Sequence, residues 1–498
     1  MFSGFKKGVV QAQIEAMIPP PIQQRKSKIA FISVAIEAHF DWQQARDANA
    51  QMSSHIKSML PSSEYDWVAA AEPFEDHAAM EAFLSAEYAK GLDGVILYHA
   101  AYTTGEIAST LGLWLRAHPV PIFSYSMPEV TGKNLTANRL CSQNFVLGIL
   151  RNMQVKYQWL FCEKDDEKLQ NQVQLFAKAS RAIGYFKGKK ALIAGAGRVP
   201  GFYDCEVNEM DIIKRFGVGF DRVNLVEFTS QMGNYSDDAI ESLRRSILSE
   251  DDCKFNNVPD DQFDRSLRFA LALMTYTRER DYIGVSLKNW PELFDHFQIA
   301  GDGAMSLMND QGIVVSDEAD TGALLSMLVL DQLGDSDLPP MLSDLSYFNA
   351  QENALGLWHN GSAATRLRHS QSGFECRKHG ILENYDEATA WGVLFEFLVQ
   401  PGPVTVMRLM APSSDKAMLF EGEIVDSELK FRGTYGQFIP KQETAAQIIG
   451  TVMDKGLDHH WLVGRGHYIE ALRGFNYWLG IDEIAIDNPG DSCGFGKQ

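Results

Sequence analysis

Several features that would point to a particular partner or compartment are scarce in this sequence of 498 residues. Its six cysteines include no CxxC pair, which argues against a disulfide framework or a zinc ribbon and favours a reducing cytoplasm. No run of about 18 apolar residues is present, and the proline-rich start lacks the apolar core of a signal peptide. We therefore expect a soluble protein that is not exported by that route and has no membrane partner. The formal net charge of −20 argues against a nucleic-acid partner, because no basic stripe is present to displace counterions from phosphates.

The remaining composition is that of an ordinary globular protein, with 45% hydrophobic and 22% charged residues. Long disordered stretches are therefore not expected. A chain of this length exceeds what one hydrophobic core holds, and we expect about two to four domains.

The first part of the chain alternates β-rich apolar runs with helical segments. KIAFISVAI from Lys28, GVILYHA from Gly94 and PVPIFSYS from Pro119 predict strands buried on both faces of a parallel sheet. Such βαβ units form open α/β sheets, and their ligands bind beyond the carboxyl ends of the strands. Helices are expected over residues 47–59, 77–90 and 106–117. The polar side chains at the strand ends are candidate ligand contacts, although a role as simple strand caps is equally open: Glu37, His39, His99 and Tyr125.

A helical stretch is expected over residues 155–186, and a second βα series begins at Lys189. There Gly195-Ala-Gly197 follows a strand, as in dinucleotide-binding turns. Because Pro200 stands at the third glycine position, we disfavour nicotinamide binding.

The next helix is predicted to start after Asp204 and to end at Gly217. Met210, Ile213 and Phe216 are expected to face the core from it. A further buried strand is predicted over residues 281–287, followed by short helices over 292–297 and 304–309.

Beyond about residue 345 the pattern changes to short strand-like runs without helices between them. The runs are ALGLW, WGVLFEF, PVTVMRLM, AMLFEGEIV and ELKFRG, separated by Pro, Gly and Asp. They predict an antiparallel β domain, either a small barrel or a sandwich. A helix over residues 444–455, a strand over 461–463, a helix over 469–479 and a last strand are expected to follow.

The candidate site is carried by the segment from Val314 to Gly361. An apolar run ends there in Asp317-Glu318, and Asp344 and His359 follow at the edges of later segments. Carboxylates and a neutral imidazole suit a hard divalent cation if these element ends meet in one cleft. A simpler interpretation is that Glu318 caps a helix beginning near Ala319, with Asp344 a loop acid and His359 a strand-end histidine.

The pair His459-His460 adds a fourth element to this set. Consecutive residues of one strand point to opposite sides, so we expect only one of the two histidines to reach a metal. The other could touch a ligand or pack against the protein.

Four segments together resemble the L-arabinose isomerase and L-fucose isomerase superfamily, over nearly the whole chain. SDEADTGALLSML from Ser316 is similar to the family's glutamate-bearing turn into a helix. LSDLSYF followed by LGLWHNG is similar to its second acid and first histidine, and DHHWLVGRG to its histidine pair. RVPGFYDCEVNEMDIIKRFG from Arg198 is similar to its central-domain segment.

The resemblance implies an α/β fold with two flavodoxin-like parallel-sheet domains, followed by a C-terminal domain with an antiparallel β-barrel. The three domains would span residues 1–165, 166–340 and 341–498. It also implies a cytoplasmic homo-oligomer, a trimer, tetramer or hexamer, whose active site is shared between subunits.

The activity implied is aldose–ketose isomerisation, an intramolecular oxidoreduction of carbohydrate metabolism, on a pentose or 6-deoxyhexose similar to L-arabinose or L-fucose. A divalent metal, Mn²⁺ by family likeness, would polarise the carbonyl, and Glu318 and Asp344 would be the catalytic acid/base pair. Arabinose isomerases carry Glu-Asp where this chain has Ser343-Asp344, whereas fucose isomerases use Asp, which favours Asp344. The metal ligands implied are Glu318, Asp344, His359 and His460, and the sugar contacts are His459, Glu37, His39 and Tyr125.

Two other functions are compatible with the same residues. One is a non-catalytic relative that binds sugar in the same cleft. The other is a metal-assisted sugar epimerase, which shares the enediol intermediate.

Overall fold

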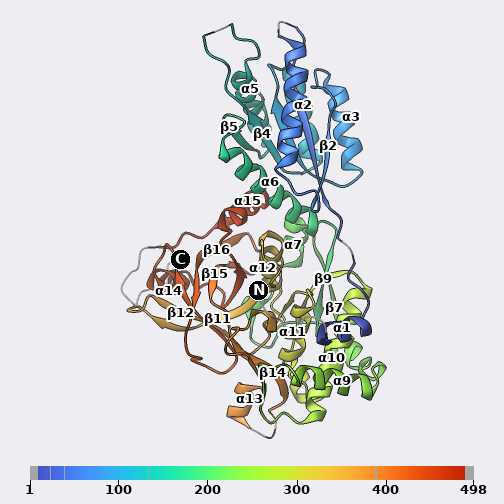
Figure 1. The fold of residues 1–498 in the computed structure, drawn as a ribbon, viewed down its shortest axis with the longest axis vertical. Coiled ribbons are helices and arrows are strands. Elements are labelled where there is room, and N and C mark those ends of the chain that lie inside the picture. The colour runs from blue at the N-terminus through green and yellow to red at the C-terminus, as the bar shows by residue number, and fades with distance from the viewer. Residues whose placement is uncertain are drawn as a thin grey trace. The chain divides into compact units, whose positions relative to one another are not determined.

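The computed structural model describes residues 9–22, 24–38, 40–132, 134–386, 388 and 390–487 (Figure 1). Its contacts divide the chain into two compact units. The N-terminal unit comprises residues 24–185 and 473–478, and the main unit comprises residues 1–23, 186–472 and 479–498. The predicted division into three domains stays a prediction. In the part of the chain that the structure describes, no helix has the length and apolar character needed to cross a membrane.

The N-terminal unit is built on a parallel sheet of order β2-β1-β3-β4-β5, the order of flavodoxin-like sheets. The alternation predicted from the sequence is confirmed here, because β1 and β3 are buried along almost their whole length. The strands are β1 Ser27–Val34, β2 Tyr65–Ala69, β3 Leu92–His99, β4 Ile122–Ser126 and β5 Gln158–Phe161. The helices are α2 Trp42–Ser58, α3 His77–Tyr88, α4 Gly105–Ala117, α5 Arg139–Asn152 and α6 Glu167–Phe186.

Two helix boundaries of this unit differ from the prediction. The stretch expected to be helical over 155–186 contains the strand β5 before α6, because its short apolar run QWLF suits a strand as well as a helix. Helix α2 begins five residues earlier than expected, since the Asp41 carboxylate accepts a hydrogen bond from the Gln44 backbone N–H at 3.0 Å and caps it.

The main unit contains a second parallel sheet, of order β10-β9-β6-β7. Its strands are β6 Lys190–Ala194, β7 Gly219–Val223, β9 Tyr282–Leu287 and β10 Val315–Ser316. The helices in this part are α1 Val9–Met17, α7 Glu209–Phe216, α8 Leu225–Thr229, α9 Asp237–Leu248, α10 Asp260–Glu279, α11 Gly301–Asp310 and α12 Thr321–Leu333. Shorter helical turns lie at Tyr203–Cys205, Met232–Asn234 and Leu293–Phe297.

Helix α7 ends at Gly217 as predicted, in the left-handed conformation with φ of 75°. Its core face was predicted correctly only for Phe216. Met210 and Ile213 are 68% and 42% exposed, whereas Ile212 and Phe216 are buried. The helix begins only at Glu209, behind the Asn208 cap, so just two turns form and the inward stripe is the i, i+4 pair.

The rest of the main unit is a mixed, largely antiparallel sheet of order β19-β16-β15-β18-β11-β12-β17-β14-β13-β8, in which β16 also pairs with β17. The predicted change to antiparallel structure is confirmed. Its strands are β8 Cys253–Phe255, β11 Met341–Asn349, β12 Ala354–His359, β13 Phe374–Lys378, β14 Gly392–Leu398, β15 Gly402–Leu409, β16 Lys416–Val425, β17 Thr434–Pro440, β18 His460–Arg465 and β19 Asp482–Glu483. Its helical elements are α13 Gly380–Tyr385, α14 Ala445–Lys455 and the turn Thr365–Leu367, and the helix α15 Ile469–Leu479 begins in this unit, while its residues 473–478 belong to the N-terminal unit.

Two details of this region differ from the prediction. ELKFRG is not a strand, and the strand β17 follows it; the helix α13 interrupts a series expected to lack helices. The helix α14 is confirmed, with a reciprocal capping box between Thr444 and Gln447.

Helix α12 is the element that joins the two sheets of the main unit. It is apolar on nearly all sides and buried along its length, and it packs against β9, β15 and β18. The turn that precedes α12 is therefore held close to β18, which carries His460.

Candidate active site

The turn from β10 into α12 carries Glu318. Asp320, not Glu318, caps the helix, because its Oδ1 accepts a hydrogen bond from the Ala323 backbone N–H at 2.7 Å. The interpretation of Glu318 as the helix cap is therefore wrong. Glu318 and Ala319 have φ of 58° and 55°, a left-handed conformation that costs non-glycine residues on the order of 1 kcal/mol each.

Sheet pairing brings the other candidate residues to the same place. In the mixed sheet, Asp344 of β11 stands opposite His460 of β18 on one side and opposite Trp358 of β12 on the other. Asp344 therefore belongs to a strand, not to a loop as the simpler interpretation held. His359 is the last residue of β12, and its ring lies 5.6 Å from the ring of His460.

The resulting cluster contains Glu318, Asp344, His359 and His460. Glu318 Oε2 lies 3.2 Å from His460 Nε2, and Asp344 Oδ1 lies 3.8 Å from the same nitrogen. One ligand atom each of Glu318, His359 and His460 lie within 4.8 Å of one another. All four residues predicted from the sequence to hold a metal are thus brought together in the main unit.

His459 is also part of this site, contrary to the expectation that consecutive histidines diverge. The two rings lie 3.9 Å apart, and His459 Nε2 lies 3.6 Å from Glu318 Oε2. The alternation of a strand does not apply because β18 begins only at His460. The other ring nitrogen, Nδ1, lies 2.6 Å from the Asp204 carboxylate, which also accepts the His459 backbone N–H.

Asp320 fixes the orientation of His460. Its Oδ2 lies 2.7 Å from His460 Nδ1, so that nitrogen donates and the lone pair of Nε2 is left facing Glu318. The same carboxylate pairs with the guanidinium of Arg408 at 2.7 Å, and Asp458 pairs with Arg408 at 3.0 Å. Both Asp320 and Arg408 are fully buried.

The residues of the cluster shift one another's pKa values. Burial would raise the pKa of Glu318, but the neighbouring imidazoles of His459 and His460 hold that pKa below its usual range. Burial would lower the pKa of His459, but the carboxylates of Asp204 and Glu318 raise it to about 10. Burial raises the pKa of Asp317 well above its ordinary value, with further contributions from the nearby carboxylates of Asp302 and Glu318. Because the pKa of Glu318 is held below its usual range, this carboxyl group is an anion at neutral pH.

The donor set fits a hard divalent metal ion. Three of its buried polar atoms, His460 Nε2, His359 Nδ1 and Asp344 Oδ1, have no hydrogen-bond partner among the described residues. Buried polar atoms are nearly always satisfied, and a cation held by two carboxylates and two imidazoles would satisfy these.

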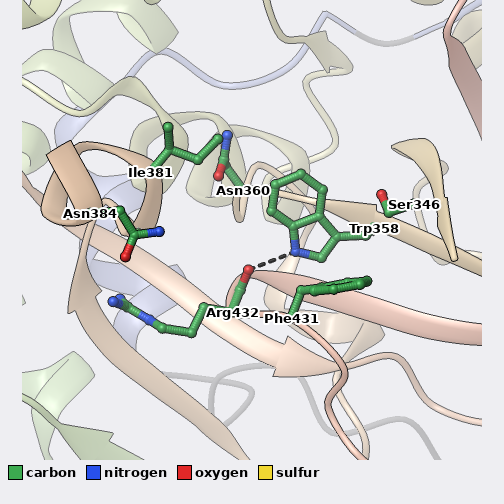
Figure 2. Close-up of a pocket in the computed structure, with 8 residues that line it drawn as sticks. Ser346, Trp358, Asn360, Ile381, Asn384, Phe431 and Arg432 are labelled. Atoms are coloured by element: carbon green, nitrogen blue, oxygen red, sulfur yellow. Dashed lines mark hydrogen bonds between the residues drawn. The ribbon is translucent and has the colours of Figure 1, made fainter.

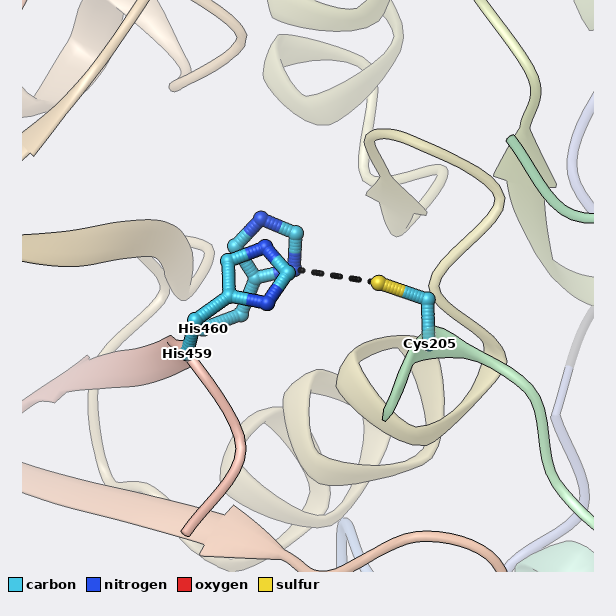
Figure 3. Close-up of side chains that lie close together, drawn as sticks. All are labelled: Cys205, His459 and His460. Carbon is cyan, nitrogen blue, oxygen red and sulfur yellow. Dashed lines mark hydrogen bonds between the residues drawn. The ribbon is translucent and has the colours of Figure 1, made fainter. Parts of the chain in front are cut away.

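A second cluster of possible ligands, Cys205 with His459 and His460, lies beside the first (Figure 3). Cys205 Sγ lies 4.0 Å from His460 Nδ1. That nitrogen already donates to Asp320, and burial raises the pKa of the thiol, which keeps it protonated. The cluster around Glu318 is therefore the better metal site.

The remaining predicted sugar contacts belong to the N-terminal unit. Tyr125 is buried, and its hydroxyl donates to the Cys162 carbonyl at 3.0 Å; Glu37 is exposed, and its backbone N–H donates to Glu75. His39 lies outside the described residues. A role of these residues in binding sugar stays a prediction. His99 is fully buried, with both ring nitrogens bonded to serine hydroxyls, which suits a structural role.

Several residues that support the site were not identified from the sequence: Asp320, Asp204, Arg408 and Trp290, whose indole N–H donates to Glu318 at 3.4 Å. A signal existed for Asp320 alone. It stands directly before Thr-Gly-Ala-Leu-Leu, and aspartate is a better helix cap than glutamate.

Comparisons with known proteins give relatives but no family model, since none matches the sequence. The chain is 23% identical over 374 residues to a sulfoquinovose isomerase of Alkalicoccus urumqiensis, covering 74% of this chain and 81% of the relative. It is 22% identical over 398 residues to a sulfoquinovose isomerase of Priestia aryabhattai, covering 79% and 85%. A sulfoquinovose isomerase of Clostridium sp. (strain MSTE9) is 21% identical over 359 residues, covering 71% and 77%. The prediction that this chain is an isomerase enzyme is thereby confirmed, while its kinship with arabinose and fucose isomerases stays a prediction.

Proposed function

We propose that this chain is a metal-dependent aldose–ketose isomerase of a monosaccharide. The observation that carries the proposal is the convergence of Glu318, Asp344, His359 and His460, with three of their buried polar atoms lacking a partner among the described residues. Relatives that share most of the chain's length and are named isomerases of a sugar support it.

The chain's own residues account for the proton transfers. Glu318, held as an anion, accepts the proton from C2 of the aldose, and the hydroxyl proton moves from O2 to O1. Asp344, whose side chain is 33% exposed, takes up a proton from solvent and delivers it to C1, and Glu318 releases the C2 proton to solvent, so that both carboxylates return to their starting state. A bound divalent cation would supply Lewis-acid polarisation of the carbonyl and would acidify the neighbouring hydroxyl. Glu318, Asp344, His359 and His460 would hold that cation.

Two further features belong to the same proposal. Mn²⁺ is the metal we expect, from the resemblance to the arabinose and fucose isomerases. We also propose that β16, β15, β18, β11, β12 and β17 close into a barrel, which the pairing of β16 with β17 supports. A homo-oligomer with a shared site remains our expectation from the family resemblance.

A panel assay tests the function. Metal-stripped protein, with and without added Mn²⁺, is incubated with L-arabinose, D-arabinose, L-fucose, D-xylose, L-rhamnose, D-galactose and sulfoquinovose, and ketose formation is measured. We expect Mn²⁺-dependent ketose from at least one sugar and its loss in Glu318→Gln. Glu227→Gln removes the same charge from an exposed position of α8 and is the matched control.

Unchanged turnover in Glu318→Gln would refute the role of this carboxylate. Solvent deuterium at C2 without any ketose would favour an epimerase. Sugar binding without exchange, for every sugar of the panel, would favour a binding protein.

A further inference from the structure

A cavity of about 390 Å³ lies in the main unit and is lined chiefly by Ser346, Trp358, Asn360, Asn384, Phe431 and Arg432 (Figure 2). We call these six residues and the space between them the distal pocket. Its volume falls within the range of about 300–1,000 Å³ that small-molecule sites occupy. A monosaccharide fits within it.

The distal pocket adjoins the candidate metal cluster at Trp358 and at Ser346. Trp358 stands opposite Asp344 in the pairing of β11 with β12, and opposed residues of antiparallel strands have their side chains on the same face. The rings of Trp358 and His359 lie 6.2 Å apart. The pairing of β11 is irregular between Leu345 and Tyr347, and such an irregularity re-aims the side chain of the extra residue, here Ser346, which lines the pocket.

The polar groups of the distal pocket are available for a ligand. The side chains of Ser346, Asn360 and Asn384 make no hydrogen bond to any residue that the structure describes. The Trp358 indole N–H donates to the Arg432 carbonyl at 2.6 Å, which fixes the plane of the ring (Figure 2). Fixed aromatic faces beside unengaged amides and a hydroxyl suit the apolar C–H faces and the hydroxyls of a sugar.

The charge of the distal pocket disfavours an anion. Arg432 is the one cation among its lining residues, and its guanidinium is already occupied. Glu383 pairs with Nη1, Glu396 accepts from Nη2 at 2.9 Å, and the Lys378 carbonyl accepts from Nη2 at 3.0 Å. Two carboxylates against one guanidinium leave this wall without a free positive charge for a sulfonate.

We propose that the distal pocket binds the end of the sugar remote from the reacting carbons and that it selects an uncharged end. The inference rests on the proposed isomerase function. It sets this chain apart from relatives whose names refer to a sulfonated sugar. The substrate class is then a neutral aldose, with a hydrogen, a methyl or a hydroxymethyl group where sulfoquinovose carries its sulfonate.

Calorimetry on Mn²⁺-loaded protein tests the proposal with pairs of sugars. Sulfoquinovose is compared with 6-deoxy-D-glucose, which differs only in lacking the sulfonate, and with L-fucose and L-arabinose. We expect at least one neutral sugar to bind about tenfold or more tightly than sulfoquinovose, a difference of about 1.4 kcal/mol. Trp358→Leu should weaken the neutral sugar about tenfold while Mn²⁺ affinity stays unchanged. Glu383→Gln removes one of the two carboxylates that pair with Arg432. It should reduce the difference in binding affinity between the neutral sugars and sulfoquinovose.

Three results would refute the proposed role of the distal pocket. These are tighter binding of sulfoquinovose than of every neutral sugar, no binding of any sugar, or wild-type affinity for the neutral sugar in Trp358→Leu. Ketose formation separates this proposal from the proposed function. Neutral sugar binding that depends on Trp358, without ketose from any sugar, leaves the pocket standing and refutes the isomerase. Ketose from sulfoquinovose alone leaves the isomerase standing and refutes the pocket.

Discussion

Replacing Asp320 with asparagine separates the two tasks of this carboxylate. Asparagine is an equally good helix cap, so its oxygen can still accept from the Ala323 N–H. Its amide can donate to His460 Nδ1, which would place the ring proton on Nε2 and block the lone pair that faces Glu318. Loss of such a supporting carboxylate typically lowers metal affinity about 10- to 100-fold, or about 1.4–2.7 kcal/mol.

The same substitution removes a partner from Arg408. Removing the partner of a buried charge typically lowers the free energy of unfolding by about 3–5 kcal/mol. We expect the lower end of this range because Asp458 still pairs with the guanidinium. Asp458→Asn is the matched control, since it removes the other partner of Arg408 without contacting His460. Urea unfolding measures the stability of both variants, and calorimetric titration measures Mn²⁺ affinity.

We expect both variants to be less stable than the wild type. Only Asp320→Asn should bind Mn²⁺ more weakly once the affinity is corrected for the fraction of folded protein. Wild-type Mn²⁺ affinity in Asp320→Asn would refute the positioning role. Equal losses of affinity in the two variants would assign the effect to Arg408 instead.

Three further predictions concern acid stability, a helix cap and the metal. Burial lowers the pKa of His99 to about 3, so its contribution to stability is complete above the unfolded pKa of about 6.5 and falls by about 1.4 kcal/mol per pH unit below it. Urea unfolding at pH 7 and pH 5 should therefore show a loss of about 2 kcal/mol from this residue that His99→Gln lacks; an equal loss in the variant would contradict the assignment. Thr444→Ala removes the capping box of α14 and should cost about 1 kcal/mol in the same assay, whereas no change would show that the cap contributes nothing. Mn²⁺ at 100 times its dissociation constant should stabilise the protein by about 2.7 kcal/mol in thermal unfolding, and Glu318→Gln should lose this gain; an equal gain in the variant would place the metal elsewhere.

The elements that the sequence predicted best are those buried on both faces. β1 and β3 appear as continuous apolar runs because helices cover the two faces of their sheet. β5 and β17 were missed for the opposite reason. The sequence of β5, QWLF, is only four residues long and shows little of the alternation typical of strands. The sequence of β17, TYGQFIP, contains glycine and proline, which strands usually avoid.

The candidate ligands could be predicted because carboxylates and imidazoles at element ends are rare enough to be noticed. Their supporting contacts could not. Asp320 and His460 are 140 positions apart, and only the packing of α12 against β18 brings them together. The pairing of Arg408 with Asp320 is likewise a consequence of tertiary packing and leaves no local pattern.

The position of β18 has a consequence for synthesis of the chain. This strand lies between β15 and β11, although it follows both in the sequence, by roughly 50 residues in the case of β15. Until it is made, two strand edges stand open, and ribosomes adding about 5–20 residues per second leave them open for some 3–10 seconds. Such edges invite pairing with other chains. The nascent protein should therefore depend on chaperones most strongly in the interval before His460 emerges, and the binding site should be completed last.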